Sequence, residues 1–372
     1  MRIGLNLLYL LPGVVGGTET YAVSLLGGLA ALPPDHDYVV YVNRESADLA
    51  LPSAPNVTVV ACPVRAASRA RRYAFEQLQL PRLVRRDSLD VLHSLGYVGP
   101  LAVRCPHVVT VHDLIYVGFR DHLPLGKRLV LRLFVRSSVR RAARVIAVST
   151  SSKAQIVADV GVPADRVCVV HEAGRVWPGG AAADAEAVLE RHRIRAPYVV
   201  AFSSLSPSKN LPRLVEAFAR IADRVEAQLV LIGHLPPGSS VEQAVDNAGP
   251  RERVRTTGFV PDADLAPLIG QAALFAFPSL YEGFGLPVLD AQSLGVPVVC
   301  SSAASLPEVA GDGALFIDPQ SVVELADALL RGLTDEAVRA DLVARGHRNA
   351  ERFSWDRAAR ETVAVYEQAA AP

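Results

Sequence analysis

The chain is organised around residues 277–295, which read FPSLYEGFGLPVLDAQSLG. The apolar run 272–278 predicts a buried strand, and apolar residues return at helical spacing from Pro287 until Gly295 ends the helix. Two glycines separate these elements, so we expect a strand, a turn nearly free of side chains, and a helix. Unpaired backbone N–H groups at such a helix N-terminus suit an anion or a sugar hydroxyl.

Two carboxylates flank this turn. Glu282 precedes it, and Asp290 lies one helical turn inside the predicted helix, so that a ligand lying across the turn would meet both. A loop acid followed by a solvated acid in the first turn of a helix has the same spacing. The spacing alone leaves both interpretations open.

The stretch resembles the E-x7-E segment of retaining glycosyltransferases of family 4, which have the GT-B fold and move a sugar from a nucleotide donor. The likeness continues through GVPVV at 295–299 and SLPEV at 305–309, and Asp290 stands where the family more often has Glu. The resemblance implies that Glu282 binds a hydroxyl of the donor sugar rather than acting as a covalent nucleophile, and that Asp290 binds the ribose. The turn residues implied to bind the donor are Gly283, Phe284, Gly285 and Leu286.

Composition predicts an ordinary globular protein. The chain has 372 residues, half of them hydrophobic, which is enough for two domains with their own cores. No apolar run reaches the length of a membrane span and no charged leader precedes the first strand, so we expect neither a signal peptide nor a spanning helix, and a cytoplasmic location. The cysteines are widely spaced beside apolar runs, which predicts buried free thiols rather than disulfides or a zinc site; they are Cys62, Cys105, Cys168 and Cys300.

The net charge of zero hides an asymmetry. Residues 1–180 contain 21 Lys and Arg against 13 Asp and Glu, and the remaining residues contain 17 against 25. Part of the basic excess lies in 65–72, and part in 127–144, where an arginine recurs every four residues from Arg128 to Arg140 opposite Leu129, Leu133 and Phe134. A basic amphipathic helix is compatible with peripheral contact with an anionic membrane, although a solvated helix face docked on its own sheet is the preferred interpretation. We expect no nucleic-acid partner.

The chain begins with a predicted strand, a glycine-rich loop and a helix. The strand is expected over residues 3–11, and the loop lacks the G-x-G-x-x-G spacing of a dinucleotide site, so no nicotinamide cofactor is expected. Gly16 and Gly17 resemble the family's first loop, which faces the donor phosphates and the acceptor. A tight turn without a ligand is the alternative.

Further strands alternate with helical stretches, which predicts a doubly wound parallel sheet with ligands at the carboxyl ends of its strands. The strands are expected at 38–42, 57–61, 89–93, 108–111, 145–148 and 167–170. His112 follows one of them and matches the family residue that touches the donor sugar. For His93 a structural role is preferred, Asp113 is expected to orient its loop, and the hydroxyls of 149–152 are expected to cap a helix.

A second α/β domain is predicted from about Asp184, after a linker at 171–183. Its first strand leads into SSLSPSKNL at 203–211, which resembles the family's pyrophosphate-binding loop. Lys209 and Asn210 match that loop, which here has no arginine, so the resemblance implies that Lys209, serine hydroxyls such as that of Ser204, and backbone N–H groups neutralise the diphosphate. A lysine at a helix start is the alternative.

Two further segments complete the resemblance. Gly258, Phe259 and Val260 match the edge where the family's nucleobase lies. The D-x-D at 262–264 is a metal–diphosphate pattern in other glycosyltransferases, but it precedes an apolar helix, so we expect N-capping and no metal site. The tail, 353–369, resembles the terminal helix that crosses back to the first domain.

We therefore predict a GT-B fold: two doubly wound Rossmann-like domains facing across a cleft, 1–175 on the acceptor side and 176–352 for the nucleotide sugar, with 353–372 returning to the first. The predicted reaction is retaining transfer of a hexose from a UDP- or GDP-sugar to a hydroxyl of a glycan, glycolipid or glycosylated small molecule. Its predicted catalytic residues are His112, Lys209 and Glu282, and the nucleotide sugar is a substrate, so no cofactor is expected. The alternatives are a sugar-nucleotide epimerase or hydrolase, and a catalytically silent nucleotide-sugar-binding partner.

Overall fold

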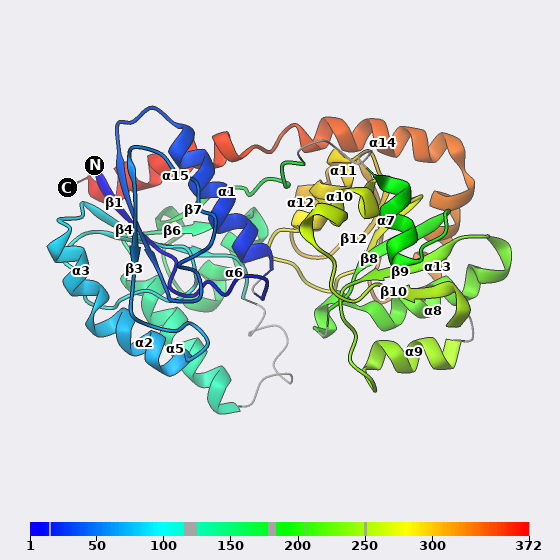
Figure 1. The fold of residues 1–372 in the computed structure, drawn as a ribbon, viewed down its shortest axis with the longest axis horizontal. Coiled ribbons are helices and arrows are strands. Elements are labelled where there is room, and N and C mark those ends of the chain that lie inside the picture. The colour runs from blue at the N-terminus through cyan, green and yellow to red at the C-terminus, as the bar shows by residue number, and fades with distance from the viewer. Residues whose placement is uncertain (15, 115–124, 178–183, 205, 249–250, 372) are drawn as a thin grey trace. The chain divides into compact units, whose positions relative to one another are not determined.

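The computed structural model describes residues 1–372 except 15, 115–124, 178–183, 205, 249–250 and 372, and does not describe the side chains of 125–128 and 130. The chain divides into two compact units (Figure 1). Unit 1 consists of Met1–Ala173 and Phe353–Pro372, and unit 2 of Gly174–Arg352. The sequence predicts boundaries after residues 175 and 352, and the structure has them after residues 173 and 352. Part of its linker, 178–183, lies outside the described residues.

Unit 1 contains a seven-stranded parallel sheet with the order β3-β2-β1-β4-β5-β6-β7. Its strands are β1 (Arg2–Asn6), β2 (Asp37–Val42), β3 (Val57–Ala61), β4 (Val91–Ser94), β5 (His107–Val111), β6 (Arg144–Ala147) and β7 (Val167–Val169). The strand order reverses between β1 and β4. At such a switch point the loops after neighbouring strands diverge to opposite faces and leave room for a ligand.

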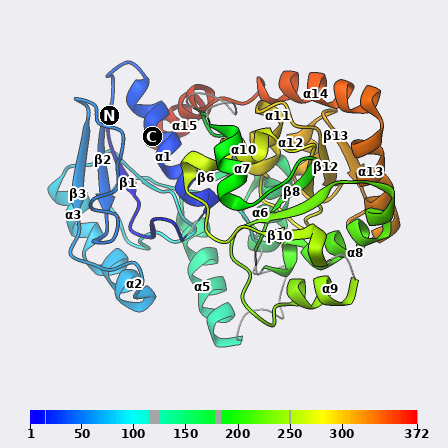
Figure 2. The ribbon, with the colours of Figure 1, turned by 45° about the vertical axis from the view of Figure 1, so that its right-hand side comes forward.

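Helices cover both faces of this sheet (Figures 1 and 2). The helices α1 (Gly17–Ala31) and α15 (Trp355–Ala370) share one core with β1, β2 and β4, so the C-terminal helix packs on the first unit. The remaining helices of this unit are α2 (Arg69–Leu78), α3 (Leu80–Arg86), α5 (Leu125–Arg141) and α6 (Thr150–Val160). Ser149 caps α6 by accepting a hydrogen bond from the Ser152 N–H, as predicted.

The first strand is shorter than predicted. β1 ends at Asn6, whose side-chain oxygen accepts the Leu8 N–H at 3.1 Å, and the Leu10 N–H closes a turn onto the Leu7 carbonyl at 3.0 Å. The prediction of a strand to residue 11 is therefore wrong. Leu7, Leu8 and Leu10 are fully buried, so the apolar run reflects burial of the loop rather than extension of the strand.

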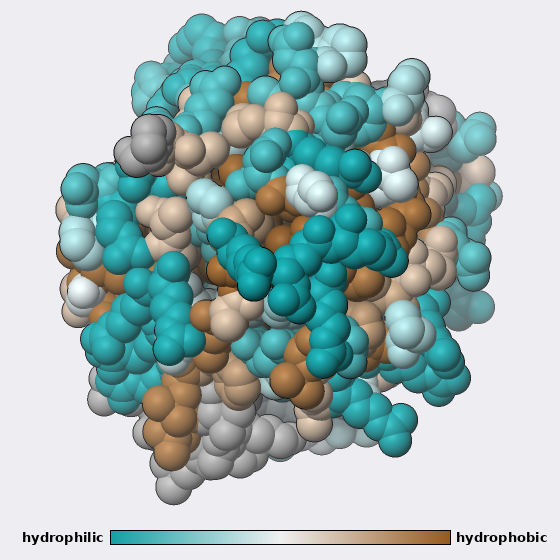
Figure 3. All heavy atoms as spheres, turned by 90° about the vertical axis from the view of Figure 1, so that its left-hand side faces the viewer, coloured by the Kyte–Doolittle hydropathy of each residue, from teal (hydrophilic) through white to brown (hydrophobic). Residues whose placement is uncertain are grey.

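The basic helix α5 is docked on the sheet through Val135 and Val139, which are fully buried. Leu129 and Leu133 are 59% and 58% exposed, so they are not the docked residues. The structure does not describe the side chains of Lys127 and Arg128. Figure 3 shows hydrophobic residues interleaved with hydrophilic ones on the face viewed there. Contact with an anionic membrane stays a prediction.

Unit 2 contains a six-stranded parallel sheet with the order β10-β9-β8-β11-β12-β13. Its strands are β8 (Tyr198–Phe202), β9 (Gln228–Ile232), β10 (Val254–Thr256), β11 (Leu274–Phe277), β12 (Val298–Ser301) and β13 (Ala314–Ile317). Its helices are α7 (Ala185–His192), α8 (Leu211–Ile221), α9 (Ser240–Ala248), α10 (Asp262–Gly270), α11 (Leu286–Ser293), α12 (Leu306–Ala310), α13 (Val322–Thr334) and α14 (Glu336–Ala350). The switch point of this sheet lies between β8 and β11, which places the 203–211 and 278–285 loops at one edge.

The D-x-D segment does not cap α10. The cap position is Pro261, without a side-chain cap, and Asp264 is buried, where it accepts hydrogen bonds from Arg191 at 2.7 and 2.8 Å and pairs with His192 at 2.9 Å. Burial alone would raise the pKa of Asp264, but the hydrogen bonds from His192 and Arg191 outweigh burial and lower it. The N-cap prediction is wrong because a partner about 70 residues away uses this carboxylate to hold α7 on α10.

Candidate functional site

The loops that follow β8 and β11 are hydrogen-bonded to each other. The Leu280 N–H donates to the Ser208 carbonyl at 2.7 Å. This pairing brings together Lys209 and Glu282, two of the predicted site residues, with Nζ and Oε1 2.6 Å apart. Lys209 Nζ also lies 4.9 Å from the centroid of the Phe277 ring. The side chains of the pair are 26% and 14% exposed, so the ion pair is partly shielded but remains accessible to a ligand.

The turn beside this pair requires a glycine at position 285. Gly285 has φ 119°, and a Cβ there would lie 2.7 Å from a methyl group of Leu306, so only glycine fits. α11 starts at the next residue and directs its first N–H groups to this edge. Phe284 and Leu286 are only 4% and 8% exposed, so a donor would meet their backbone rather than their side chains.

Ser305 supports the turn and was not singled out by the sequence. Its hydroxyl donates to the carbonyl oxygens of Phe284 at 2.6 Å and Glu282 at 3.1 Å. It begins the SLPEV segment, where the resemblance indicated a match but no role. The hydroxyl therefore fixes the carbonyl groups of the turn.

Asn210 is fully used inside the protein. Its Nδ2 donates to the carbonyl oxygens of Pro278 at 3.0 Å and Pro319 at 2.7 Å, and its Oδ1 accepts from Arg213 at 2.8 Å. It also has φ 59°, a left-handed conformation that asparagine tolerates. The structure thus shows Asn210 as the residue that fastens the phosphate-loop candidate, and its contact with a donor stays a prediction.

Arg213 is a cation that the sequence analysis missed, because it lies beyond the loop in α8. With Ser204, Ser206 and Asn210 it lines a pocket of about 590 Å³. The Ser204 hydroxyl accepts the Ser206 N–H at 3.1 Å, which shapes the loop. No local pattern points to Arg213, because Lys209 lies in a separate 3-10 turn before the left-handed Asn210 and does not share a helix face with it.

Asp290 lies inside α11 and is 3% exposed. Its Oδ1 accepts the backbone N–H of Arg175 at 2.7 Å, and its Oδ2 lies 3.8 Å from Arg175 Nε. Burial raises the pKa of Asp290 to about 6, and the hydrogen bond and charge of Arg175 offset that shift only in part. In the free protein this carboxylate therefore holds the 174–175 segment, and its contact with a ribose stays a prediction.

The predicted nucleobase edge follows β10. Gly258 has φ 72° and forms a bridge with Gly233, and Phe259 projects from this turn with 80% of its surface exposed. Val260 is buried in the core. Of the three predicted residues, Phe259 is therefore the one whose side chain is available to stack on a base.

The glycine-rich loop of unit 1 follows β1 at the carboxyl edge of its sheet. Gly16 has φ 59° and precedes α1, which starts at Gly17. The Gly13 N–H donates to Glu19 at 2.8 Å and folds the loop back onto the helix. The structure therefore shows a glycine-dependent turn at a helix N-terminus, and its contact with phosphates stays a prediction.

His112 follows β5 directly and is 6% exposed. Its Nδ1 lies 2.9 Å from a Glu172 carboxylate oxygen, and its Nε2 lies 2.9 Å from the Leu95 carbonyl. Both partners accept, so both ring nitrogens carry protons. Burial alone would lower the pKa of His112, but the hydrogen bond and charge of Glu172 outweigh it and raise the pKa above its ordinary value. The side chain is a fixed imidazolium, and its contact with a donor sugar stays a prediction.

His93 has a different environment. It is fully buried, with Nδ1 2.7 Å from the Tyr366 hydroxyl and Nε2 2.7 Å from Thr110 Oγ1, and burial lowers its pKa to about 3. This neutral ring ties α15 to the sheet, which is a structural role. Asp113 accepts a hydrogen bond from the Tyr97 hydroxyl at 3.0 Å.

Three other features of the described residues bear on the chemistry. They contain no group of three or more His, Cys, Asp or Glu side chains arranged to hold a metal ion. All four cysteines are free thiols, two of them buried. None of the helices in the described part of the chain combines the length and apolar character needed to cross a membrane.

Comparison with known families matches both units. The family described as Glycosyltransferase Family 4 matches residues 15–173, and that described as Glycosyl transferases group 1 matches residues 187–349.

Two curated relatives match most of the chain. The O-antigen chain mannosyltransferase B of Escherichia coli is 33% identical over 264 residues, covering 70% of this chain and 69% of the relative. The MMP alpha-(1->4)-mannosyltransferase of Mycolicibacterium hassiacum is 33% identical over 306 residues, covering 77% and 72%. Among solved structures, sucrose-phosphate synthase from Thermosynechococcus elongatus superposes with a TM-score of 0.80 at 20% identity, covering 99% of this chain and 98% of that one, which shows the shared fold. The chain therefore belongs to glycosyltransferase family 4 and has the GT-B fold.

Proposed function

We propose that this glycosyltransferase moves a hexose from a nucleoside-diphosphate sugar to a hydroxyl acceptor, with retention of the anomeric configuration. The observation that carries the proposal is the 2.6 Å pair of Lys209 and Glu282 beside the turn at the N-terminus of α11. A cation, a carboxylate and a helix N-terminus at one sheet edge are what a donor made of a diphosphate and a sugar requires.

Lys209 is assigned to the diphosphate. The leaving nucleoside diphosphate gains negative charge in the transition state, and a preorganised cation stabilises that charge more than it stabilises the ground state. The backbone N–H groups of 283–286 act on the same charge. Arg213 supplies a second cation, which offsets the absence of arginine from the loop itself. These groups need no metal ion, and the leaving phosphate takes the proton of the acceptor.

Glu282 is assigned to a hydroxyl of the donor sugar rather than to a covalent intermediate. In the free protein its carboxylate is paired with Lys209, and its oxygen atoms can accept a hydrogen bond from a hydroxyl when the diphosphate takes over the lysine. Asp290 is assigned to the ribose and Phe259 to the base.

Unit 1 is assigned to the acceptor. The imidazolium of His112, held by Glu172 and the Leu95 carbonyl, is a fixed positive charge at the end of β5. His112 is assigned to the donor sugar in the reacting complex. Its loss should therefore lower the turnover more than the affinity for the nucleotide. The Gly16–Gly17 turn is assigned to the donor phosphates and the acceptor.

The sugar is assigned from the relatives. Both curated relatives above are named as mannosyltransferases, so a nucleoside-diphosphate mannose is the first donor to test. The experiment measures thermal stabilisation of the protein by UDP-, GDP- and dTDP-sugars, because a ligand of the folded state raises its midpoint by mass action.

Products made from the stabilising donor, with and without a panel of hydroxyl acceptors, then decide among the three functions. Acceptor-dependent glycoside supports the proposal. A new nucleotide sugar or free sugar formed without acceptor identifies an epimerase or a hydrolase. Binding without any product across the panel identifies a silent binding partner.

A further inference from the structure

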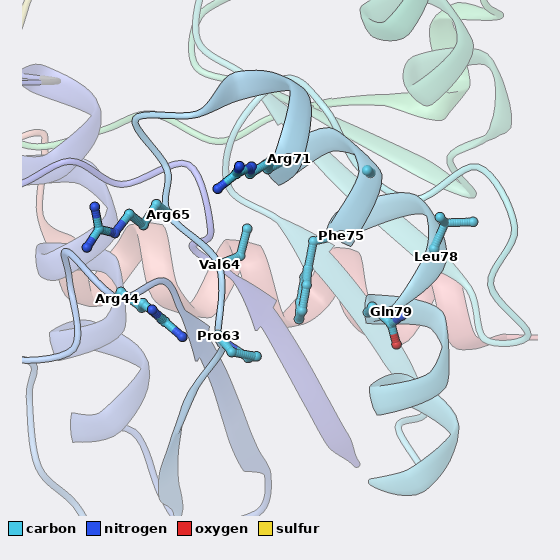
Figure 4. Close-up of a pocket in the computed structure, with 9 residues that line it drawn as sticks. Arg44, Pro63, Val64, Arg65, Arg71, Phe75, Leu78 and Gln79 are labelled. Carbon is cyan, nitrogen blue, oxygen red and sulfur yellow. The ribbon is translucent and has the colours of Figure 1, made fainter.

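A second pocket lies in unit 1, whereas Lys209 and Glu282 belong to unit 2. Its volume is about 570 Å³, and it is formed by the segment after β2, the segment after β3, and α2 (Figure 4). β2 and β3 are parallel neighbours, so both segments leave the carboxyl edge of the sheet, where ligands of open α/β sheets bind. The pocket lies at β2 and β3 rather than at the switch point between β1 and β4, so the side chains of its lining must support a ligand.

Three guanidinium groups line the pocket: those of Arg44, Arg65 and Arg71. They come from three separate segments and lie toward one side of the pocket in the view of Figure 4. Among the residues that the structure describes, none of the three forms an ion pair with a carboxylate within 4.0 Å, whereas Arg72 on the same helix is paired with Glu76. Arg65 interacts electrostatically with Glu45 without forming an ion pair, and the guanidinium groups of all three arginines can still bind an anion from outside the chain.

The segment that carries Arg65 is held in place by the chain itself. The carboxylate of Glu45 accepts the N–H groups of Ala66 at 3.0 Å and Ala67 at 3.4 Å, and the Arg44 N–H donates to the Val64 carbonyl at 3.0 Å. The two arginine-bearing segments are thus tied together before any ligand binds. Guanidinium forks carried on segments that are tied together match a phosphate, because each fork can donate two parallel hydrogen bonds.

Apart from Gln79, the rest of the lining is apolar. Val64 is buried, Phe75 is partly buried, and Leu78 is 63% exposed at the end of α2, on the side opposite the arginines in Figure 4. Inorganic phosphate has no apolar part that could contact these side chains, whereas a ligand with a hydrocarbon part would cover them.

We propose that this pocket binds the phosphate or diphosphate group of an amphiphilic molecule, with its apolar part against Phe75 and Leu78. The identification of this molecule as the acceptor rests on the proposed function; the binding itself does not. The same chemistry is present in a monomeric alkyl phosphate and in a phospholipid headgroup, and the experiment separates these two sources.

The test is calorimetric titration of the full chain with inorganic diphosphate and with octyl phosphate kept below its micelle concentration. The test variant is Arg65→Gln with Arg71→Gln, and the matched control is Arg69→Gln with Arg85→Gln, which removes the same charge from α2 and α3 but leaves the pocket lining intact. We expect the test variant to lose tenfold or more in affinity for octyl phosphate and the control to lose little, since loss of a charge-assisted hydrogen bond costs about tenfold or more. Equal losses in the two variants would overturn the site.

Leu78→Ser tests the apolar wall without disturbing a buried side chain. It is expected to weaken octyl phosphate by about threefold or more and to leave inorganic diphosphate unchanged. Octyl phosphate that binds no more tightly than inorganic diphosphate to the wild-type chain would overturn the amphiphilic part of the proposal.

A parallel arm uses vesicles of phosphatidylcholine with and without phosphatidic acid. Loss of vesicle binding in the test variant but not in the control identifies a lipid headgroup as the source, and arginine-dependent binding of octyl phosphate without vesicle binding identifies a soluble phosphate. No donor sugar or turnover enters these measurements, so a failure of the proposed transfer reaction does not affect them.

Discussion

Replacement of Glu282 by Gln is expected to tighten the binding of a nucleoside diphosphate while it abolishes most of the turnover. In the free protein the Glu282 carboxylate lies 2.6 Å from Lys209 Nζ. A phosphate oxygen that accepts a hydrogen bond from the same Nζ would lie about 5 Å from that carboxylate. Two negative charges at this distance repel by about 1 kcal/mol in water and about 3 kcal/mol at an effective dielectric constant of about 20. The substitution removes this repulsion and the competition for Lys209, so affinity should rise by about 5- to 100-fold.

The assay is calorimetric titration with GDP and UDP, paired with a product assay on the stabilising donor. Glu216→Gln is the control, because Glu216 lies on α8 in the same unit, is exposed, and pairs with Arg220 rather than with the site. The affinity for the intact nucleotide sugar should rise less than that for the diphosphate, since Glu282 also loses its hydrogen bond to the sugar. Weaker or unchanged diphosphate binding in the Glu282→Gln variant would refute the assignment of Lys209 to the phosphates.

Three further outcomes are expected. Asp290→Asn should raise the free energy of unfolding by up to about 3 kcal/mol above pH 7, because a pKa of about 6 in the folded protein against an ordinary 3.8 makes the buried charge costly. The gain should vanish below about pH 4, where the carboxyl is protonated in both the folded and the unfolded state. Denaturant titrations across this pH range check the prediction, and a variant less stable than wild type at pH 8 would contradict it. His112→Ala should lower kcat by about tenfold or more with little change in nucleoside-diphosphate affinity, provided that a melting scan shows the variant folded, whereas an equal fall in affinity would place His112 in the support of the nucleotide site. Activity should persist in excess EDTA, and loss with rescue by Mn²⁺ or Mg²⁺ would show that a metal shares the charge assigned to Lys209.

The sequence was most informative where residues of a local motif also form a contact between distant parts of the chain. Lys209 and Glu282 lie 73 residues apart, and the resemblance placed both at one ligand although periodicity alone assigned them only to two loops. The alternation of strands and helices predicts only the class of fold. It does not predict the order of the strands, and so it does not predict the switch point that brings the two loops together. The contact between Lys209 and Glu282 is seen only in the structure.

The local patterns did not show partners that are distant in the sequence. Asp264 has the local signature of a helix cap, but Arg191 and His192 hold it. Asn210 has the local signature of a ligand-binding loop residue, yet the carbonyl oxygens of Pro278 and Pro319 use its amide. A local pattern shows which hydrogen bonds a side chain can form, and the folded chain determines which of them it does form.

The central claim is that Lys209 binds the diphosphate of a nucleotide donor. The most direct test is calorimetric titration of wild type and Lys209→Met with a nucleoside diphosphate and with the corresponding nucleoside. The account predicts that the variant loses about 1.5 to 3 kcal/mol in binding the diphosphate, about 10- to 100-fold in affinity, and nothing in binding the nucleoside. Equal losses for the two ligands, or no loss for either, would contradict it.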